Sequence, residues 1–230
     1  MQKSFTMAEI LITLGIIGVV VAMTLNSIMT KYQHKVLEAA FKKTYSNLMQ
    51  AMIYAEPDLS NMSANFAGDS NSEFYSKLWE KYNIVRNLND NSVFGAVNLY
   101  KQMGGVKTYN KKNTADVGCP QLPHLIAMDG MAVGGMYNCG ANWIVVDVNG
   151  PYKKPNTLGH DIFYFGVDNA KRQIFALGLN KVHSYWNFSS QSQYCSKNSN
   201  SEKNGYGCTI FALQNKCPDD AAKTYWECLP

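Results

Sequence analysis

The sequence contains none of the short motifs that mark common catalytic or cofactor sites. It has no Gly-x-Ser-x-Gly, no His-Glu-x-x-His, no phosphate-binding loop and no dinucleotide fingerprint. Its cysteines form no Cys-x-x-Cys pair, and no histidine stands at zinc-finger spacing from any of them. The sequence therefore predicts neither an enzyme nor a cofactor, and no metal site is assigned to it.

Charged residues are also few. They make up 17% of the 230 residues, against 46% hydrophobic residues, and 21 Lys and Arg against 17 Asp and Glu give a formal net charge of +4. A positive charge this small and dispersed does not predict a nucleic-acid partner. A chain of this length and apolar fraction is expected to bury a hydrophobic core, which excludes intrinsic disorder.

Cysteine is absent from the first half of the chain. An even number of cysteines in a loop-rich second half predicts disulfides formed in an oxidising compartment. Because short loops close most easily, neighbour pairing is favoured among the possible connectivities. The pairs are then Cys119 with Cys139, Cys195 with Cys208, and Cys217 with Cys228.

A long uncharged segment lies near the N-terminus. No charged residue occurs from Ile10 to Thr30, and as a helix this segment would span roughly the 30 Å of a bilayer core. A secretory signal peptide is the alternative, with a passable cleavage site at residues 20–22. The length of the segment and the acidic Glu9 at its entrance count against a signal peptide, because a carboxylate in an apolar segment is costly and needs a purpose.

Residues 3–22 read Lys-Ser-Phe-Thr-Met-Ala-Glu-Ile-Leu-Ile-Thr-Leu-Gly-Ile-Ile-Gly-Val-Val-Val-Ala. This segment resembles the N-terminal cleavage and methylation segment of type IV prepilins and of type II secretion pseudopilins. The resemblance implies that a prepilin peptidase removes a leader, residues 1–4, between Ser4 and Phe5 and methylates the new amino terminus of Phe5. It also implies that Glu9 is an assembly residue, neutralised by the amino terminus of a neighbouring subunit.

The resemblance implies a fold, a location and partners as well. The fold is α+β and pilin-like, with a long N-terminal helix packed on an antiparallel sheet and a disulfide-stapled C-terminal region. The chain is expected to cross the cytoplasmic (inner) membrane once, N-terminus inside and C-terminal domain outside, before it enters a filament. The implied partners are other pilin or pseudopilin subunits, the prepilin peptidase, the inner-membrane assembly platform and membrane lipid. Two positions depart from the family, Ser4 where Gly is usual and Asn26 where Pro is frequent.

An amphipathic segment follows the uncharged one without a break. Apolar residues recur at steps of three and four with lysines between them, and no Pro or Gly interrupts before Pro57. The pattern predicts one helix, with a transmembrane and filament-core part over 5–30 and an amphipathic part over 31–56. The apolar stripe of the second part is expected to lie on a β-sheet.

Residues 57–122 are predicted to form a connecting region. It includes a short amphipathic helix over 73–82, which buries Phe74, Leu78 and Trp79. Residues 77–112 also carry an excess of basic groups, which indicates a solvated face or, alternatively, a surface for a polyanion. These basic residues are Lys77, Lys81, Arg86, Lys101, Lys107, Lys111 and Lys112.

Residues 123–180 show the pattern of an antiparallel sheet. Apolar runs separated by turn residues predict four or five strands, and the Asp129-Gly130 pair predicts a two-residue hairpin between the first two. The predicted strands are 125–128, 131–133, 142–148, 161–167 and 173–177. The Cys-rich region 181–230 has little apolar pattern, so disulfides are expected to replace a core there.

A second block, residues 146–150 with 155–163, resembles a block found in minor pilins and pseudopilins. Within it, Asp147, Asn149 and Asp161 offer the hard oxygen ligands that calcium prefers. The Gly of Asp-x-Asn-Gly falls at the fourth position rather than the sixth that an EF-hand requires. The alternative is a turn in which Asp and Asn bond to their own backbone.

These features together predict a structural subunit, a minor pilin or pseudopilin, of a bacterial type IV pilus or type II secretion filament. The subunit would be processed by a prepilin peptidase and assembled through its N-terminal helix. The alternative is a membrane-anchored extracytoplasmic enzyme or ligand-binding domain. Against an enzyme, only His160 has a carboxylate neighbour, Asp161, and adjacent strand positions point to opposite faces. The sequence does not choose between pilus and secretion filament, or between major and minor subunit.

Overall fold

The computed structural model describes residues 6–55, 73–89, 94–117, 122–138, 141–168, 173–178 and 190–230. The chain consists of two compact units, Met1–Val36 and Leu37–Pro230. It combines a long apolar N-terminal helix with an antiparallel six-stranded sheet, which confirms the α+β class.

The first described element is helix α1, Met7–Ala55, which extends through both units. In the first unit the apolar side chains of α1 are exposed, including Leu11, Ile16 and Val20. By length and composition α1 is apolar enough to cross a membrane, a test that a signal sequence near the N-terminus also passes. The predicted single helix is confirmed from Met7 onward, because no breaker interrupts it before Pro57.

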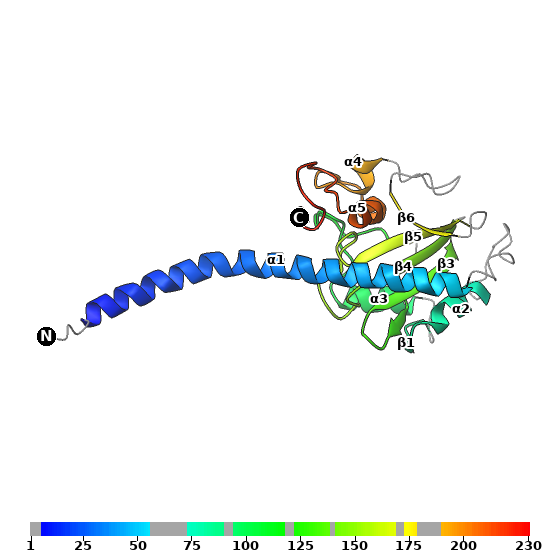
Figure 1. Ribbon diagram of the computed structural model, residues 1–230, viewed down its shortest axis with the longest axis horizontal. Helices are drawn as coiled ribbons and strands as arrows, with labels where there is room; N and C mark the ends of the chain where they lie inside the picture. Colours follow the sequence, from blue (N-terminus) through cyan, green and yellow to red (C-terminus); the bar gives the residue numbers. More distant parts are fainter. Residues whose placement is uncertain are drawn as a thin grey trace. The chain divides into compact units, whose positions relative to one another are not determined.

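The second unit contains the sheet, whose six strands follow one another in chain order (Figure 1). All neighbouring pairs are antiparallel. Five of the strands lie in the region predicted to form the sheet. The strands are β1 (Ile84–Asn87), β2 (Leu125–Ala127), β3 (Ala132–Asn138), β4 (Ala141–Asp147), β5 (Ile162–Asp168) and β6 (Gln173–Ala176). The prediction missed β1, because this short edge strand has no alternation of buried and exposed residues.

The β2–β3 hairpin differs from the predicted two-residue turn. The Gly130 amide donates to the Ala127 carbonyl over 2.9 Å, and the Ala127 amide donates to the Met131 carbonyl over 2.9 Å. Only Gly130 in this turn has positive φ, at 88°, whereas a two-residue Asp-Gly turn needs positive φ at both residues. The connection is therefore one residue longer, with Gly130 in the left-handed position that follows a type I turn.

The sheet separates two hydrophobic clusters. Phe163 and Phe165 of β5 face one cluster, while Ile162 and Tyr164 face the other. β4 alternates in the same way, which explains why both strands read as continuous apolar runs. Helix α3, Gly95–Gln102, covers the second face and was not predicted.

The part of α1 in the second unit covers the first face of the sheet. Its Phe41 ring lies 4.5 Å from the Phe163 ring and 5.7 Å from the Trp226 ring, measured between centroids. This packing confirms that the amphipathic segment lies on the sheet. Helix α2, Glu73–Glu80, joins the same cluster, and Phe74, Leu78 and Trp79 are buried as predicted.

The C-terminal region contributes side chains to both hydrophobic clusters of the sheet, contrary to the expectation that disulfides replace a core there. Phe211 and Trp226 join the first cluster, and Tyr206 joins the second. The prediction failed because these residues stand in short elements and loops, where burial leaves no periodic pattern. The short elements are α4 (Gln191–Tyr194), the 3-10 helix η2 (Tyr206–Cys208) and α5 (Thr209–Gln214).

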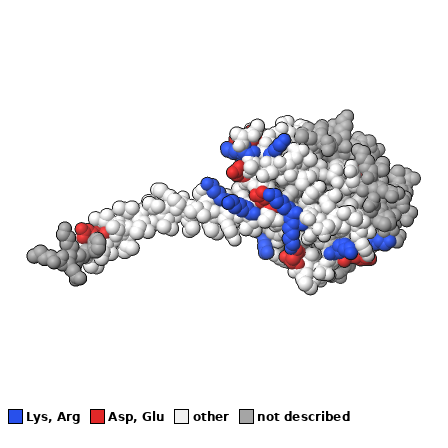
Figure 2. All heavy atoms as spheres, viewed as in Figure 1, with Lys and Arg blue, Asp and Glu red and all other residues white. Residues whose placement is uncertain are grey.

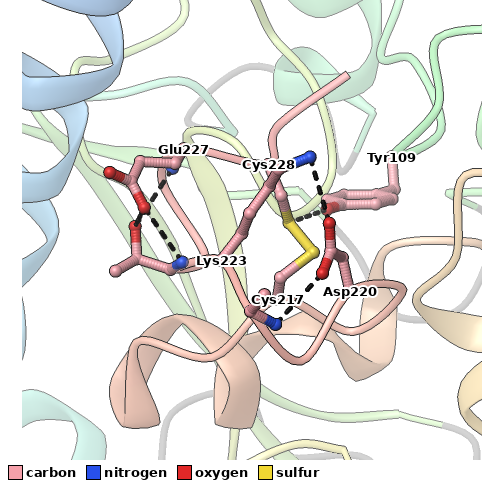
Figure 3. Close-up of polar contacts among 8 residues, drawn as sticks. Tyr109, Cys217, Asp220, Lys223, Glu227 and Cys228 are labelled. Atoms are coloured by element: carbon pink, nitrogen blue, oxygen red, sulfur yellow. Dashed lines mark hydrogen bonds and ion pairs between the residues drawn. A yellow bond between two sulfur atoms is a disulfide. The ribbon is translucent and has the colours of Figure 1, made fainter.

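Two disulfides join neighbouring cysteines in the C-terminal region. Cys195 is bonded to Cys208, and Cys217 to Cys228, which is the pairing that loop closure favours. Figure 3 shows the second disulfide, with the Tyr109 hydroxyl 3.9 Å from the Cys228 sulfur. The expected partners Cys119 and Cys139 lie outside the described residues.

Replacing both Cys217 and Cys228 with Ala should lower the free energy of unfolding by about 2–4 kcal/mol, because the disulfide restricts the conformations available to the unfolded chain. In the unmodified protein, alkylation under denaturing and non-reducing conditions should label no cysteine. Peptide mapping should recover the two linked pairs described above. Labelling of two or more cysteines would contradict the predicted oxidising compartment or the pairing.

Candidate functional site

Helix α1 starts with a reciprocal pair of contacts between Thr6 and Glu9. Glu9 Oε2 accepts hydrogen bonds from the Thr6 backbone amide over 2.8 Å and from the Thr6 hydroxyl over 3.0 Å. The Glu9 amide donates to the Thr6 hydroxyl oxygen over 3.3 Å. These contacts form a capping box, in which a Thr before the helix and a Glu three residues later satisfy each other's amides.

The capping box gives Glu9 a local structural role that the sequence analysis overlooked. The signal was present, because Thr-x-x-Glu directly before an apolar run is the sequence signature of this motif. Thr224 and Glu227 repeat it near the C-terminus, where Glu227 Oε2 accepts from the Thr224 amide and hydroxyl. A role in helix capping alone therefore accounts for a Glu at position 9, and a role in assembly needs a further argument.

From Ile10 to Thr30 helix α1 contains no charged residue, and Figure 2 shows this uncharged stretch after the acidic side chain near the start of the helix. All residues from Thr6 to Thr30 are exposed, so no described residue of the first unit covers this apolar surface. The predicted cleavage site, Ser4 and Phe5, lies outside the described residues. Cleavage and methylation at Phe5 therefore stay predictions.

The second block forms the connection between β4 and β5. Asp147, the last residue of β4, accepts hydrogen bonds at Oδ1 from the amides of Gly150 over 2.8 Å and Asn149 over 3.3 Å. Its Oδ2 accepts from the Tyr100 hydroxyl of α3 over 2.7 Å. Tyr100 was not predicted as a partner, because it stands far away in sequence on a helix that the pattern did not reveal.

Asp161 closes the same connection from its other end. Its Oδ1 accepts from the Thr157 amide and its Oδ2 from the Asn156 amide, both over 2.7 Å. Asp147 and Asp161 are both completely buried. Asp147 pairs with Ile162 across the β4–β5 ladder, so the two aspartates are brought close together at one end of the sheet.

Burial dominates the electrostatics of these aspartates. It raises the pKa of Asp147 to about 7, although the hydrogen bonds from Tyr100, Gly150 and Asn149 act in the opposite direction. Burial, with the nearby charge of Asp147, raises the pKa of Asp161 well above its ordinary value. Both shifts have the same physical cause, since a carboxylate removed from water without a cation is costly to ionise.

The geometry supports the turn interpretation of Asp147 and Asn149. Asp147 bonds to backbone amides two and three residues ahead, and Gly150 supplies the positive φ, at 80°. The Asn149 side-chain amide donates to the Lys154 carbonyl over 3.0 Å. Among the described residues, no group of three or more His, Cys, Asp or Glu is placed to hold a metal ion.

The basic residues between 77 and 112 are spread over α2, the turn after it, β1, α3 and the loop after α3. Partners of Lys81, Arg86 and Lys111 can be named. The Lys81 ammonium lies 3.7 Å from the centre of the Tyr54 ring, and Arg86 donates to the Tyr152 hydroxyl over 2.8 Å. Lys111 donates to the Pro230 carbonyl over 2.6 Å. Binding of a polyanion by this region stays an untested alternative.

His160, the histidine next to Asp161 in sequence, is buried. Its Nε2 lies 2.9 Å from the Tyr109 carbonyl oxygen. The Asp161 carboxylate instead receives the amides of Asn156 and Thr157. The two sequence neighbours therefore differ in these contacts, and both lie in the turn before β5 rather than in a strand, where the prediction placed Asp161.

No protein-family model, curated protein or solved structure matches this chain. The resemblance to prepilins and pseudopilins is therefore carried by residues 3–22 and by the β4–β5 connection alone.

Proposed function

We propose that this chain is a structural subunit, a minor pilin or pseudopilin, of a bacterial type IV pilus or type II secretion filament. The observation that carries the proposal is the position of Glu9. It is an acidic residue in the first turn of a long, exposed, apolar helix that is otherwise uncharged as far as Thr30. A lipid-exposed carboxylate needs a cation, and the amino terminus of Phe5 in a neighbouring subunit would provide one.

The capping box is compatible with this role. A Gln at the same position satisfies the same backbone amide, so capping does not require a charge in this segment. Both hydrogen bonds that the Glu9 carboxylate accepts use Oε2. The charge itself is what the assembly proposal explains.

The second unit supports the proposal at the level of architecture. The C-terminal part of α1 packs on an antiparallel sheet, which is the arrangement that a pilin-like fold requires. In the proposed topology, the N-terminus lies in the cytoplasm, α1 crosses the inner membrane, and the disulfide-bonded unit lies outside. The proposed partners are sibling subunits, the prepilin peptidase, the inner-membrane assembly platform and membrane lipid.

Processing at the N-terminus provides the test. Intact-mass and N-terminal analysis of the exported protein should find a chain that starts at Phe5 with a methylated amino terminus. A host without prepilin peptidase should retain residues 1–4. A mature chain that starts at Met23, after a signal-peptidase cut, would refute the filament role, and one that retains Met1 in the complete host would favour a membrane-anchored domain of another kind.

A further inference from the structure

The β4–β5 connection has a buried carboxyl group at each end, and no described cation forms an ion pair with either group. Asp147 and Asp161 are both fully buried, and neither forms an ion pair with another described residue. The Val148 amide donates to the Asp161 carbonyl over 2.9 Å, which fixes the backbones of the two residues side by side. Two ionised carboxylates in such a place repel each other and lack the solvation that water would provide.

Each carboxyl group also holds one end of the connection. Asp147 binds the turn at Asn149 and Gly150, and Asp161 binds the turn at Asn156 and Thr157. Asn156 is fully buried with positive φ, at 50°, and its side-chain Oδ1 has no partner among the described residues. The shape of this connection therefore depends on the two carboxyl groups rather than on a regular element.

We propose that Asp147 and Asp161 bind a proton in the folded protein and make the β4–β5 connection a pH-sensitive latch. With the proton bound, one carboxyl group is neutral and both keep their contacts to the connection. When the proton leaves, two adjacent buried negative charges repel each other and the connection opens. This inference does not depend on the filament role, because it concerns only the second unit.

Among the described residues, the groups that face the pair form no ion pair with it. From α3, Tyr100 donates to Asp147, and its own pKa is raised well above the ordinary value by burial and by the aspartates. Tyr164 of β5 is also buried, and burial raises its pKa. The Lys111 ammonium senses the Asp161 charge, but it donates to the Pro230 carbonyl, and burial lowers its pKa. The neighbouring His160 is directed to the Tyr109 carbonyl.

The direction of the pH effect follows from the direction of the shifts. An aspartate in the unfolded chain has a pKa of about 3.9, whereas the pKa of Asp147 in the folded chain is about 7. Between these values the folded state holds more protons than the unfolded state, so raising the pH favours unfolding. One retained proton changes the folding equilibrium constant by about tenfold per pH unit.

Thermal unfolding of the full-length chain in detergent micelles, followed by tryptophan fluorescence from pH 5 to pH 8, tests the latch. The unfolding midpoint of the wild type should fall as the pH rises. Asp147→Asn keeps the acceptor for Asn149 and Gly150, and its amide can donate to Tyr100, so it should fold and lose most of the pH dependence. Asp129→Asn, at an exposed aspartate in the β2–β3 turn, is the matched control and should keep the wild-type dependence.

Tyr100→Phe provides a second and independent test of proton binding by Asp147 and Asp161. The Tyr100 hydrogen bond lowers the pKa of Asp147, so its removal should move the midpoint of the pH dependence upward. If Tyr100 has only a structural role, Tyr100→Phe should lower the unfolding midpoint by the same amount at every pH. Hydrogen exchange, corrected for the intrinsic pH effect, should show loss of protection at the amides of Gly150, Asn156 and Thr157 as the pH rises.

Three results would overturn the proposal. Wild type and Asp147→Asn could show the same pH dependence, or the amides of the connection could keep their protection up to pH 8. Alternatively, millimolar calcium chloride could raise the unfolding midpoint of the wild type at pH 8 and leave that of Asp147→Asn unchanged. The last result would show that the pair holds a cation and not a proton.

Discussion

Glu9→Gln is expected to block incorporation of the protein into filaments while leaving it folded and inserted in the membrane. Glu9 lies in the first turn of α1 and belongs to the first unit, so its replacement is not expected to unfold the second unit. Loss of its charge also makes insertion into lipid easier. What the variant would lose is the proposed attraction to the amino terminus of Phe5 in a neighbouring subunit, which a low dielectric would strengthen and an uncharged amide cannot replace.

The capping box allows this charge effect to be separated from an effect on the start of the helix. Gln accepts the hydrogen bonds of a capping box as Glu does, so Glu9→Gln removes the charge and keeps the cap. Thr6→Ala does the reverse, because it removes the hydroxyl that bonds to Glu9 and keeps the carboxylate. We expect Thr6→Ala to assemble far better than Glu9→Gln.

The measurement compares membrane fractions and sheared surface filaments by immunoblot for the wild type and both variants. Equal amounts in the membrane fraction, with Glu9→Gln depleted from the filaments, would support the assembly role. If Glu9→Gln enters filaments as well as the wild type does, Glu9 is not an assembly residue. If Thr6→Ala is depleted from the filaments to the same extent, assembly depends on the geometry of the helix start and not on the charge of Glu9.

The elements that the sequence predicted correctly are those with a local pattern. Helix α1 has no breaker before Pro57, and β4 and β5 are long apolar runs between turn residues. Strand β1 and helix α3 lack such a pattern, because their burial is set by neighbours that are distant in sequence. The burial of Tyr206 and Trp226 was missed for the same reason.

Of the two candidate sites, one could be predicted from a local sequence pattern and the other could not. The contact between Thr6 and Glu9 spans three residues and was readable from the sequence alone. The burial of Asp147 and Asp161 was not, because it results from the pairing of β4 with β5 and from Tyr100 on α3. In the sequence these aspartates stand at the ends of two predicted strands, where either calcium binding or a hydrogen-bonded turn accounts for them. Only the fold shows that they are enclosed and form no ion pair with a described residue.

Phe41→Ala is expected to give the largest loss of stability of any single change proposed for the second unit. The Phe41 side chain is almost completely buried, and its ring packs on Phe163 of β5 and on Trp226 of the C-terminal region. It thus connects three segments that are distant in sequence. Removing a buried Phe side chain costs about 3–5 kcal/mol, a large part of the roughly 5–15 kcal/mol that stabilises a typical domain.

Chemical and thermal unfolding of the second unit in the full-length protein would measure this loss. The matched control is Ile53→Ala, because Ile53 lies on the same helix with 70% of its surface exposed, and its loss should change stability by only about 0.5 kcal/mol. A Trp226→Ala variant and the double variant complete a cycle, in which the two losses should not add, since the rings are in contact. If Phe41→Ala costs no more than Ile53→Ala, α1 does not pack on the sheet in solution. Additive losses would mean instead that the C-terminal region is stabilised independently of the helix, by its disulfides and its own contacts.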